Sequence, residues 1–188
     1  MVKTWNRTWT VYFQQIKRLT IIEKLLFCFA FSLLTGFSAQ IYIKLPYTPV
    51  PLTGQVFVVL LSGILLGKNF GSLSQVFYML GGICGIKWFY GGSYGIFKPT
   101  FGYIVGFVLA SYFIGKFTEN KKPGLITTVF IMLGGIFIIY LSGIFWLSLY
   151  LKISILKSFN LGVLPFIPYD ILKAILAGII SSSILKNR

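Results

Sequence analysis

The feature that most constrains this chain is an uncharged apolar run of 27 residues, 125–151. About 20 apolar residues in a helix cross the hydrocarbon core of a bilayer, so this run is long enough to span a membrane with some tilt. Apolar residues make up 56% of the 188 residues and the mean hydropathy is +0.86. Both values are higher than is typical of a soluble domain. The sequence therefore predicts an all-α integral membrane protein, because a helix satisfies its own backbone polar groups within lipid.

Six apolar runs follow one another, separated by short segments rich in proline, glycine or lysine. We expect membrane spans at about 21–43, 53–66, 70–84, 99–115, 125–151 and 165–185, in a single membrane domain that covers 1–188. Residues 1–20 mix tryptophan with lysine and arginine, which is typical of a segment in the membrane interface. Residues 44–51 contain three prolines and are expected to form a stiff extended loop. Glycines and aromatics alternate over 85–95, which indicates a loop that caps a pocket or a re-entrant stretch.

Six spans place both termini on the same side of the membrane, and the positions of Lys and Arg indicate which side. With the termini inside, eleven Lys and Arg residues flank the spans on the cytoplasmic side and five on the outer side. Cytoplasmic flanks carry the excess of positive charge, so we expect both termini in the cytoplasm and a multi-pass protein in the cell membrane. The same flanking residues account for the formal net charge of +14, and we expect the lipid bilayer, not a nucleic acid, as the partner of these charges.

The chain contains three acidic residues and no histidine, which excludes most catalytic and metal sites. Glu23, Glu119 and Asp170 lie on different segments or at their ends, so they form neither a paired-carboxylate hydrolase centre nor, without histidine, a triad or zinc site. Cys28 and Cys84 are isolated and lack metal or redox spacing. We therefore expect no catalytic residues, no metal and no enzyme activity.

Asp170 and Lys173 are opposite charges three residues apart in the last apolar run. A charged side chain at membrane depth costs at least about 2.5–3.5 kcal/mol, so an ionisable residue there is a candidate functional group. Positions i and i+3 share a helix face, so both side chains can serve one pocket. A carboxylate accepts ring N–H groups and an ammonium donates to a carbonyl, which favours a polar, partly apolar solute. The alternative interpretation is an ion pair that only holds helices together.

Several short motifs appear in order along these segments. They are Ala39-Gln40-Ile41; Pro49-Val50-Pro51-Leu52-Thr53-Gly54-Gln55; Leu65-Leu66-Gly67; Phe89 with Gly91 and Gly92; Pro99-Thr100-Phe101-Gly102-Tyr103 with Gly106-Phe107; and Pro168-Tyr169-Asp170-Ile171-Leu172-Lys173. Together, over nearly the whole chain, they resemble the BioY family, the biotin substrate-capture (S) components of energy-coupling factor (ECF) transporters. Lys87 and Trp88 depart from the family pattern, which usually has proline and valine there.

The resemblance implies the S-component fold and high-affinity capture of biotin from outside the cell. It implies that Asp170 and Lys173 bind the ureido ring of biotin. It further implies that Tyr90 and Tyr103 cover the apolar body of the ligand and that Gln55 belongs to the same pocket. The group that holds the ligand carboxylate stays open: Lys87 is a candidate, and a membrane-flanking lysine is the plainer interpretation of that residue.

The resemblance also implies partners, namely a transmembrane coupling protein and two ATPase subunits. Residues 67–69 lack the spaced glycines and hydroxyl residue of a P-loop, so we expect no cofactor here and ATP use only by the partners. Ser32 and Gly36 are small residues four apart, which suits close approach of a partner helix or packing within this chain. Two alternatives to biotin capture are an S component for another vitamin and, with less support, a small channel.

Overall fold

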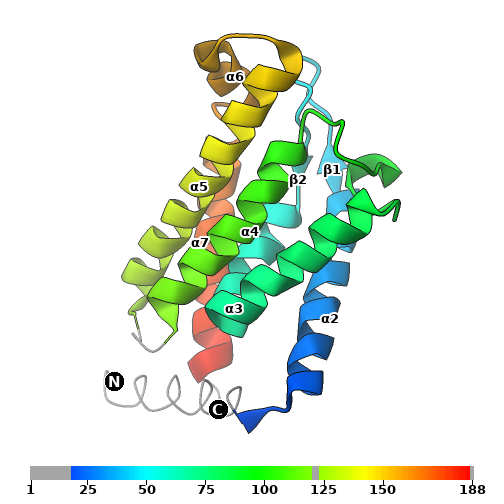
Figure 1. The fold of residues 1–188 in the computed structure, drawn as a ribbon. Coiled ribbons are helices and arrows are strands. Elements are labelled where there is room, and N and C mark those ends of the chain that lie inside the picture. Colours follow the sequence, from blue (N-terminus) through cyan, green and yellow to red (C-terminus); the bar gives the residue numbers. More distant parts are fainter. Residues whose placement is uncertain (1–17, 120–122, 187–188) are drawn as a thin grey trace.

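The computed structural model describes residues 18–119 and 123–186, so residues 1–17 of the expected interfacial segment lie outside the described part. The elements in chain order are α2 (Ile21–Gln40), β1 (Tyr42–Ile43), β2 (Leu52–Thr53), α3 (Gln55–Ile83), the 3-10 turn η1 (Tyr90–Gly92), α4 (Phe101–Thr118), α5 (Leu125–Leu151), α6 (Ile155–Gly162) and α7 (Ile167–Lys186). The long helices form a bundle, and α6, η1 and the two strands gather at one end of it (Figure 1). The start of α2 and the end of α7 lie at the opposite end.

Helix α3 consists of two helical segments that fold back on each other at Gly67. Gln55 and Tyr78 are 23 residues apart, yet Gln55 Nε2 donates a hydrogen bond to Tyr78 Oη at 2.7 Å. In a straight helix these residues would lie about 35 Å apart. Gly67 has φ 77° and ψ −177°, a conformation that essentially only glycine adopts. The carboxylate of Glu119, just after α4, accepts from the backbone amide of Lys68 at 3.3 Å and so caps the second segment.

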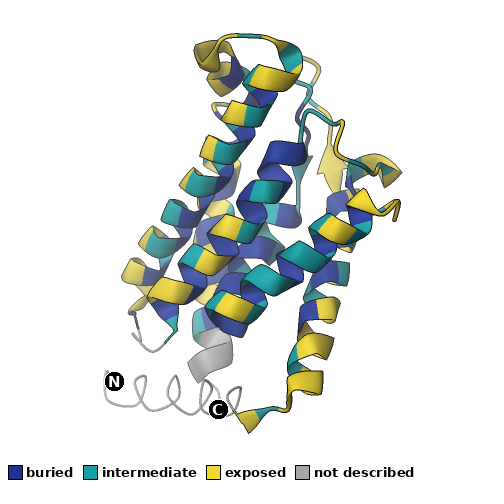
Figure 2. Cartoon of the chain, in the orientation of Figure 1, coloured by how far each residue is buried: buried dark blue, intermediate teal, exposed yellow. Residues whose placement is uncertain are grey.

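Helices α3 and α4 form the centre of the bundle, and α2 and α5 lie at its outside. In their most apolar stretches, α3 and α4 bury 56% of their residues, whereas α2 and α5 bury 28% (Figure 2). Gly106 allows α4 and α5 to approach backbone to backbone, because a Cβ at that position would lie 2.8 Å from Ile139 Cα. Buried Gln75 joins three helical segments, since its Nε2 lies 3.3 Å from Thr35 Oγ1 and 3.1 Å from Ser62 Oγ.

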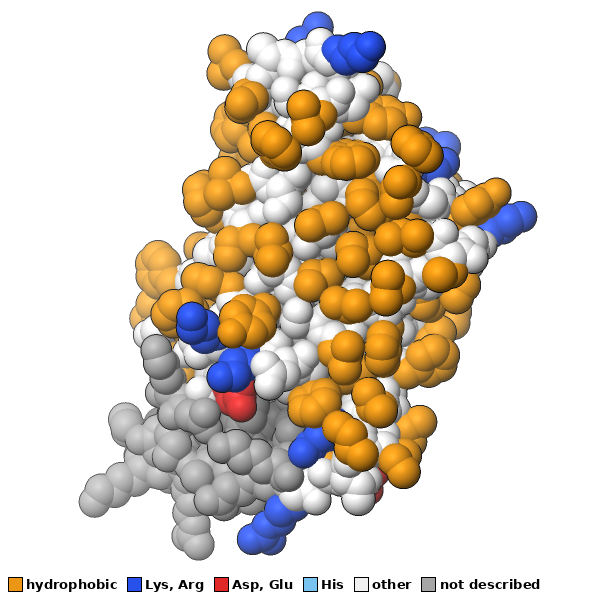
Figure 3. Space-filling view, viewed as in Figure 1, with side chains coloured by type: hydrophobic (Ala, Val, Ile, Leu, Met, Phe, Trp, Pro, Cys, Tyr) orange, Lys and Arg blue, Asp and Glu red, His pale blue; other side chains and the backbone are white. Residues whose placement is uncertain are grey.

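The outer surface of the bundle is apolar. Large side chains of α2 and α5 are exposed, such as Phe37 and Phe130, each at 69%. Hydrophobic side chains cover the middle of the face in Figure 3, and lysines gather toward its two ends. In the described part of the chain four helices, α2 to α5, are long and apolar enough to cross a membrane, or five spans if the bent pair α6 and α7, at 57°, counts as one. Such a surface is suited to lipid, not water.

Two segments differ from the sequence-based expectations. Helix α2 ends at Gln40 instead of 43, because Tyr42 pairs with Thr53 and Ile43 with Leu52 in a short antiparallel ladder that closes the proline loop. Helix α6 was not expected, and it lies between the spans at 125–151 and 165–185. Its Ser154 cap accepts from the amide of Lys157 at 3.3 Å. The hydroxyl of Thr48 in the proline loop donates to the carbonyl of Leu161 at 2.7 Å, which fastens the loop to α6.

Candidate solute-binding site

An internal cavity of about 60 Å³ lies toward the end of the bundle that carries α6, η1 and the strands. It is bounded by the proline loop, β2 and the early turns of α3, α4 and α7, together with the middle of α5. Its apolar wall includes Val50, Ile104, Phe107, Ile139 and Phe166, and its polar wall includes Thr53, Gln55, Tyr78, Tyr90, Thr100, Tyr103, Tyr140, Asp170 and Lys173. An aromatic, mainly apolar lining with a few convergent polar groups is typical of a small-molecule site.

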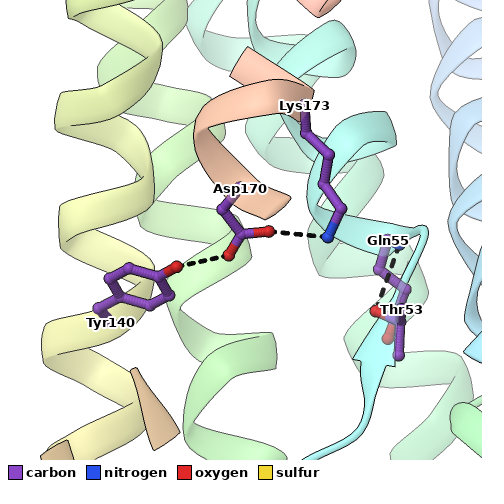
Figure 4. A network of polar contacts seen from close by, with 5 residues as sticks. All are labelled: Thr53, Gln55, Tyr140, Asp170 and Lys173. Carbon is purple, nitrogen blue, oxygen red and sulfur yellow. Dashed lines mark hydrogen bonds and ion pairs between the residues drawn. The ribbon is translucent and has the colours of Figure 1, made fainter. Parts of the chain in front are cut away.

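The polar end of this cavity is an ion pair on the first turns of α7. Lys173 Nζ lies 2.7 Å from Asp170 Oδ1, and Asp170 is buried, with 3% of its surface exposed. Tyr140 on α5 donates its hydroxyl to Asp170 Oδ2 at 2.6 Å (Figure 4). The carboxylate also lies near the N-terminus of α7, where the helix dipole favours negative charge. The buried charge is therefore compensated from three directions.

The pair keeps hydrogen-bonding capacity for a ligand. The Lys173 ammonium has three N–H donors and uses one on Asp170, and each Asp170 oxygen accepts one bond and has a further lone pair. In Figure 4 the ammonium lies between Asp170 and the side of the cavity formed by Thr53 and Gln55. The pair faces a cavity instead of being enclosed by packed side chains, which favours ligand binding over a purely structural ion pair.

The structure brings five of the residues predicted to bind substrate to one place. Gln55, Tyr90, Tyr103, Asp170 and Lys173 all line the cavity. The hydroxyl of Tyr103 donates to the carbonyl of Gly162 at 2.8 Å, so this residue offers its ring rather than its hydroxyl to the cavity. The side-chain amide of Gln55 donates to Tyr78, which holds both residues in the cavity wall.

Lys87 lies apart from this site. Its side chain is exposed, and it is not among the described residues that line the cavity. The neighbouring Trp88 packs against Tyr78, at 5.4 Å between ring centres, whereas Lys87 is exposed. The structure thus gives no support to Lys87 as a ligand contact.

Ser32 and Gly36 are both buried within this chain, which does not support a partner-facing surface at these residues. Ser32 has no exposed surface. A Cβ at Gly36 would lie 3.2 Å from Trp88 Cβ. The small residues of α2 therefore serve internal packing, the alternative that the sequence left open.

Tyr140 and Tyr78 are site residues that the sequence analysis missed. Tyr140 lies ten residues or more from both ends of the uncharged run 125–151, away from the membrane interfaces where most tyrosines are expected. A hydroxyl at that depth needs a hydrogen-bond partner, so this position was the available signal. Tyr78 carries the same signal, because it lies in the middle of the expected span 70–84, but only the reversal of α3 at Gly67 shows that its partner is Gln55.

The fold and the cavity together define a class: a multi-pass helical membrane protein with an internal, aromatic-lined pocket for a polar solute. Comparison with known proteins gives the family. The model of the BioY family matches residues 8–188, and the chain belongs to this family.

Individual relatives agree with this assignment. A biotin transporter BioY of Thermotoga maritima is 36% identical over 148 residues, which cover 77% of this chain and 86% of that protein. A probable biotin transporter BioY of Pyrococcus horikoshii is 41% identical over 160 residues, or 84% of this chain and 93% of that protein. The crystal structure of an S-component for biotin from an ECF-type ABC transporter is similar, with a TM-score of 0.82 and 25% identity, covering 90% of this chain and 96% of that one.

Proposed function

We propose that this chain captures biotin at the outer face of the cell membrane and delivers it across as the substrate-binding subunit of an ECF-type ABC transporter. The observation that carries this proposal is the Asp170–Lys173 pair, whose unused donors and acceptors face a buried aromatic cavity. Family membership and the names of the relatives support the same ligand.

The ureido ring of biotin matches the polar end of the cavity. One ring N–H group can donate to a free lone pair of Asp170, and the adjacent carbonyl can accept from Lys173. Such bonds to charged groups are stronger than bonds between neutral groups. The rings of Tyr90 and Tyr103 cover the apolar body of the ligand.

The proposed topology has six membrane crossings, formed by α2, the two segments of α3, α4, α5 and α7. The reversal of α3 at Gly67 supports this number, since it makes one continuous helix into two crossings. The start of α2 and the end of α7 lie together at the end opposite the cavity (Figure 1). With both termini in the cytoplasm, as the lysine and arginine positions favour, the cavity faces the outside.

The chain would act as a binding subunit, without catalytic residues or a cofactor of its own. A transmembrane coupling protein and two ATPase subunits would supply the energy of ATP hydrolysis. Co-purification of these subunits with the tagged chain from cell membranes would test this part of the proposal separately from ligand binding.

Ligand identity is tested by titrating the purified protein with biotin, thiamine and riboflavin, with tryptophan quenching and native mass spectrometry as readouts. We expect saturable binding of biotin alone. Asp170→Asn and Lys173→Ala should each weaken it by about 2–5 kcal/mol, because each change leaves the other charge unpaired and removes a ligand hydrogen bond. Binding of thiamine or riboflavin in place of biotin would overturn the ligand. Unchanged biotin affinity in both folded variants would overturn the site.

A further inference from the structure

A second, open groove of about 550 Å³ adjoins the cavity. The proline loop and η1 form it, and it is lined by Lys44, Leu45, Pro46, Thr48, Pro49, Pro51 and Tyr90. Pro51 and Tyr90 also line the inner cavity. These two residues are therefore a shared wall between the cavity, which contains the Asp170–Lys173 pair, and the groove.

Biotin is an elongated molecule whose carboxylate lies at the end of a four-methylene chain, opposite the ureido ring. If the ring binds at Asp170 and Lys173, the chain points away from the pair and toward the shared wall. A carboxylate is strongly hydrated, so it favours the open groove over the apolar part of the cavity. This step rests on the proposed function.

Lys44 alone carries a charge among the residues that line the groove. Within the described part of the chain it has no carboxylate at ion-pair distance. Glu23 is in the first turn of α2 and Glu119 directly follows α4, and these ends of the two helices lie at the other end of the bundle. Its ammonium lies 5.8 Å from the centre of the Tyr42 ring, close enough for a cation–π contact. The Tyr42 ring in turn packs edge-on against Tyr90, with 5.8 Å between ring centres. Through Tyr42, these aromatic contacts place the ammonium of Lys44, which has no carboxylate partner among the described residues, beside the shared wall.

We propose that Lys44 recognises the carboxylate of the captured vitamin, a role for which the sequence offered Lys87. Lys87 lines neither the groove nor the cavity. Because Lys44 is exposed, its contribution is modest: about two- to fivefold in affinity, most of it in the association rate and weakened by salt.

The experiment compares biotin with its neutral methyl ester, which keeps the ureido ring and the chain but lacks the charge. Association rates and affinities are measured by tryptophan quenching at low and high salt. The proteins are the parent, Lys44→Gln, Lys44→Arg, Lys87→Gln and, as a matched outer-end control, Lys157→Gln on α6. We expect the parent to prefer biotin about two- to fivefold at low salt. Lys44→Gln should lose this preference while binding the ester as the parent does, and Lys44→Arg and Lys157→Gln should keep it.

Several outcomes would overturn the role of Lys44. If the parent binds biotin and the ester with equal affinity, no cation of the protein recognises the carboxylate. Equal weakening of both ligands in Lys44→Gln indicates a structural effect on the loop, and loss of the preference in Lys87→Gln returns the role to Lys87. In each of these cases biotin still binds, so the proposed function stands. Absence of binding for both ligands in the parent would overturn the proposed function and this inference together.

Discussion

At the scale of single residues, the carboxylate of Asp170 is the group whose burial has to be explained. Moving an isolated carboxylate out of water costs several kcal/mol, so it persists only with close partners. Lys173 supplies the countercharge at 2.7 Å, and Tyr140 supplies a neutral donor at 2.6 Å. Lys173 carries a charge and Tyr140 does not, so the two residues have different roles beside Asp170. Lys173 can also bind the ligand, whereas Tyr140 orients the carboxylate.

Tyr140→Phe removes this orienting hydrogen bond and preserves the ring. A hydrogen bond to a charged group contributes about 1.5–3 kcal/mol, so biotin affinity should fall roughly ten- to a hundredfold. Isothermal titration calorimetry of the purified variant measures the change. Tyr150→Phe on the same helix is the control, because Tyr150 is exposed. Equal affinity in Tyr140→Phe and the parent would mean that the carboxylate is positioned without Tyr140.

At the scale of elements, the reversal of α3 decides how the pocket is assembled. The two segments would be one long rod if Gly67 were helical, and Gln55 would lie far from Tyr78. Glu119 stabilises the turn from the neighbouring helix, through the Lys68 amide. The turn at Gly67 therefore determines which residues meet in the pocket wall at the opposite end of the bundle.

Gly67→Ala should destabilise the protein by about 1–3 kcal/mol, because a Cβ is strained at φ 77°. Thermal unfolding in detergent should show a lower midpoint. Gly124→Ala is the control: Gly124 has φ −64° and open space around its Cβ position. If the two variants unfolded at the same temperature, the turn at position 67 would tolerate a side chain without strain.

The contact between α2 and Trp88 is a second element-scale feature. Gly36→Leu inserts bulk where Trp88 lies, and Trp88 packs on Tyr78 in the pocket wall. Overpacking of this kind costs about 1–3 kcal/mol, so both stability and biotin binding should decrease. Phe37→Leu, at an exposed position on the same helix, should change neither. A Gly36→Leu protein that binds biotin normally but fails to co-purify with a coupling protein would restore the partner-surface interpretation of the sequence.

At the scale of the whole molecule, the bundle is asymmetric from end to end. The pocket, the proline loop and η1 lie at one end, and the start of α2, the turn at Gly67 and the end of α4 lie at the other (Figure 1). A capture protein requires its pocket end to face the outside. Cys84, just after α3 and exposed, is a native probe of the pocket end, and Cys28 is buried.

A membrane-impermeant maleimide should therefore label Cys84 on intact cells. A Cys84→Ser protein should not be labelled. Lys116→Cys in that background places an exposed thiol near the end of α4. It should react only after the membrane is permeabilised. The reverse pattern for the two thiols would invert the proposed topology.

The sequence alone was sufficient to recognise an all-helical membrane protein and the Asp170–Lys173 pair. Both follow from local chemistry. Long uncharged runs are suited to a lipid environment, and an ionisable pair within such a run is costly, which indicates a functional site. The order of the short motifs further indicated the family that the comparisons then showed. These features are encoded in neighbouring residues, which is why they can be recognised without coordinates.

The tertiary structure decided which side chains meet. Tyr140 reaches Asp170 across 30 residues, and Gln40 reaches the carbonyl of Phe89 across 49. No local periodicity encodes such contacts. It also decided between two uses of the same residue type: Gly36 packs inward against Trp88, and Lys44, not Lys87, lines the groove beside the pocket. A small residue or a lysine carries the same local signal on either face of an element. Its role therefore depends on how that element is packed against the rest of the chain.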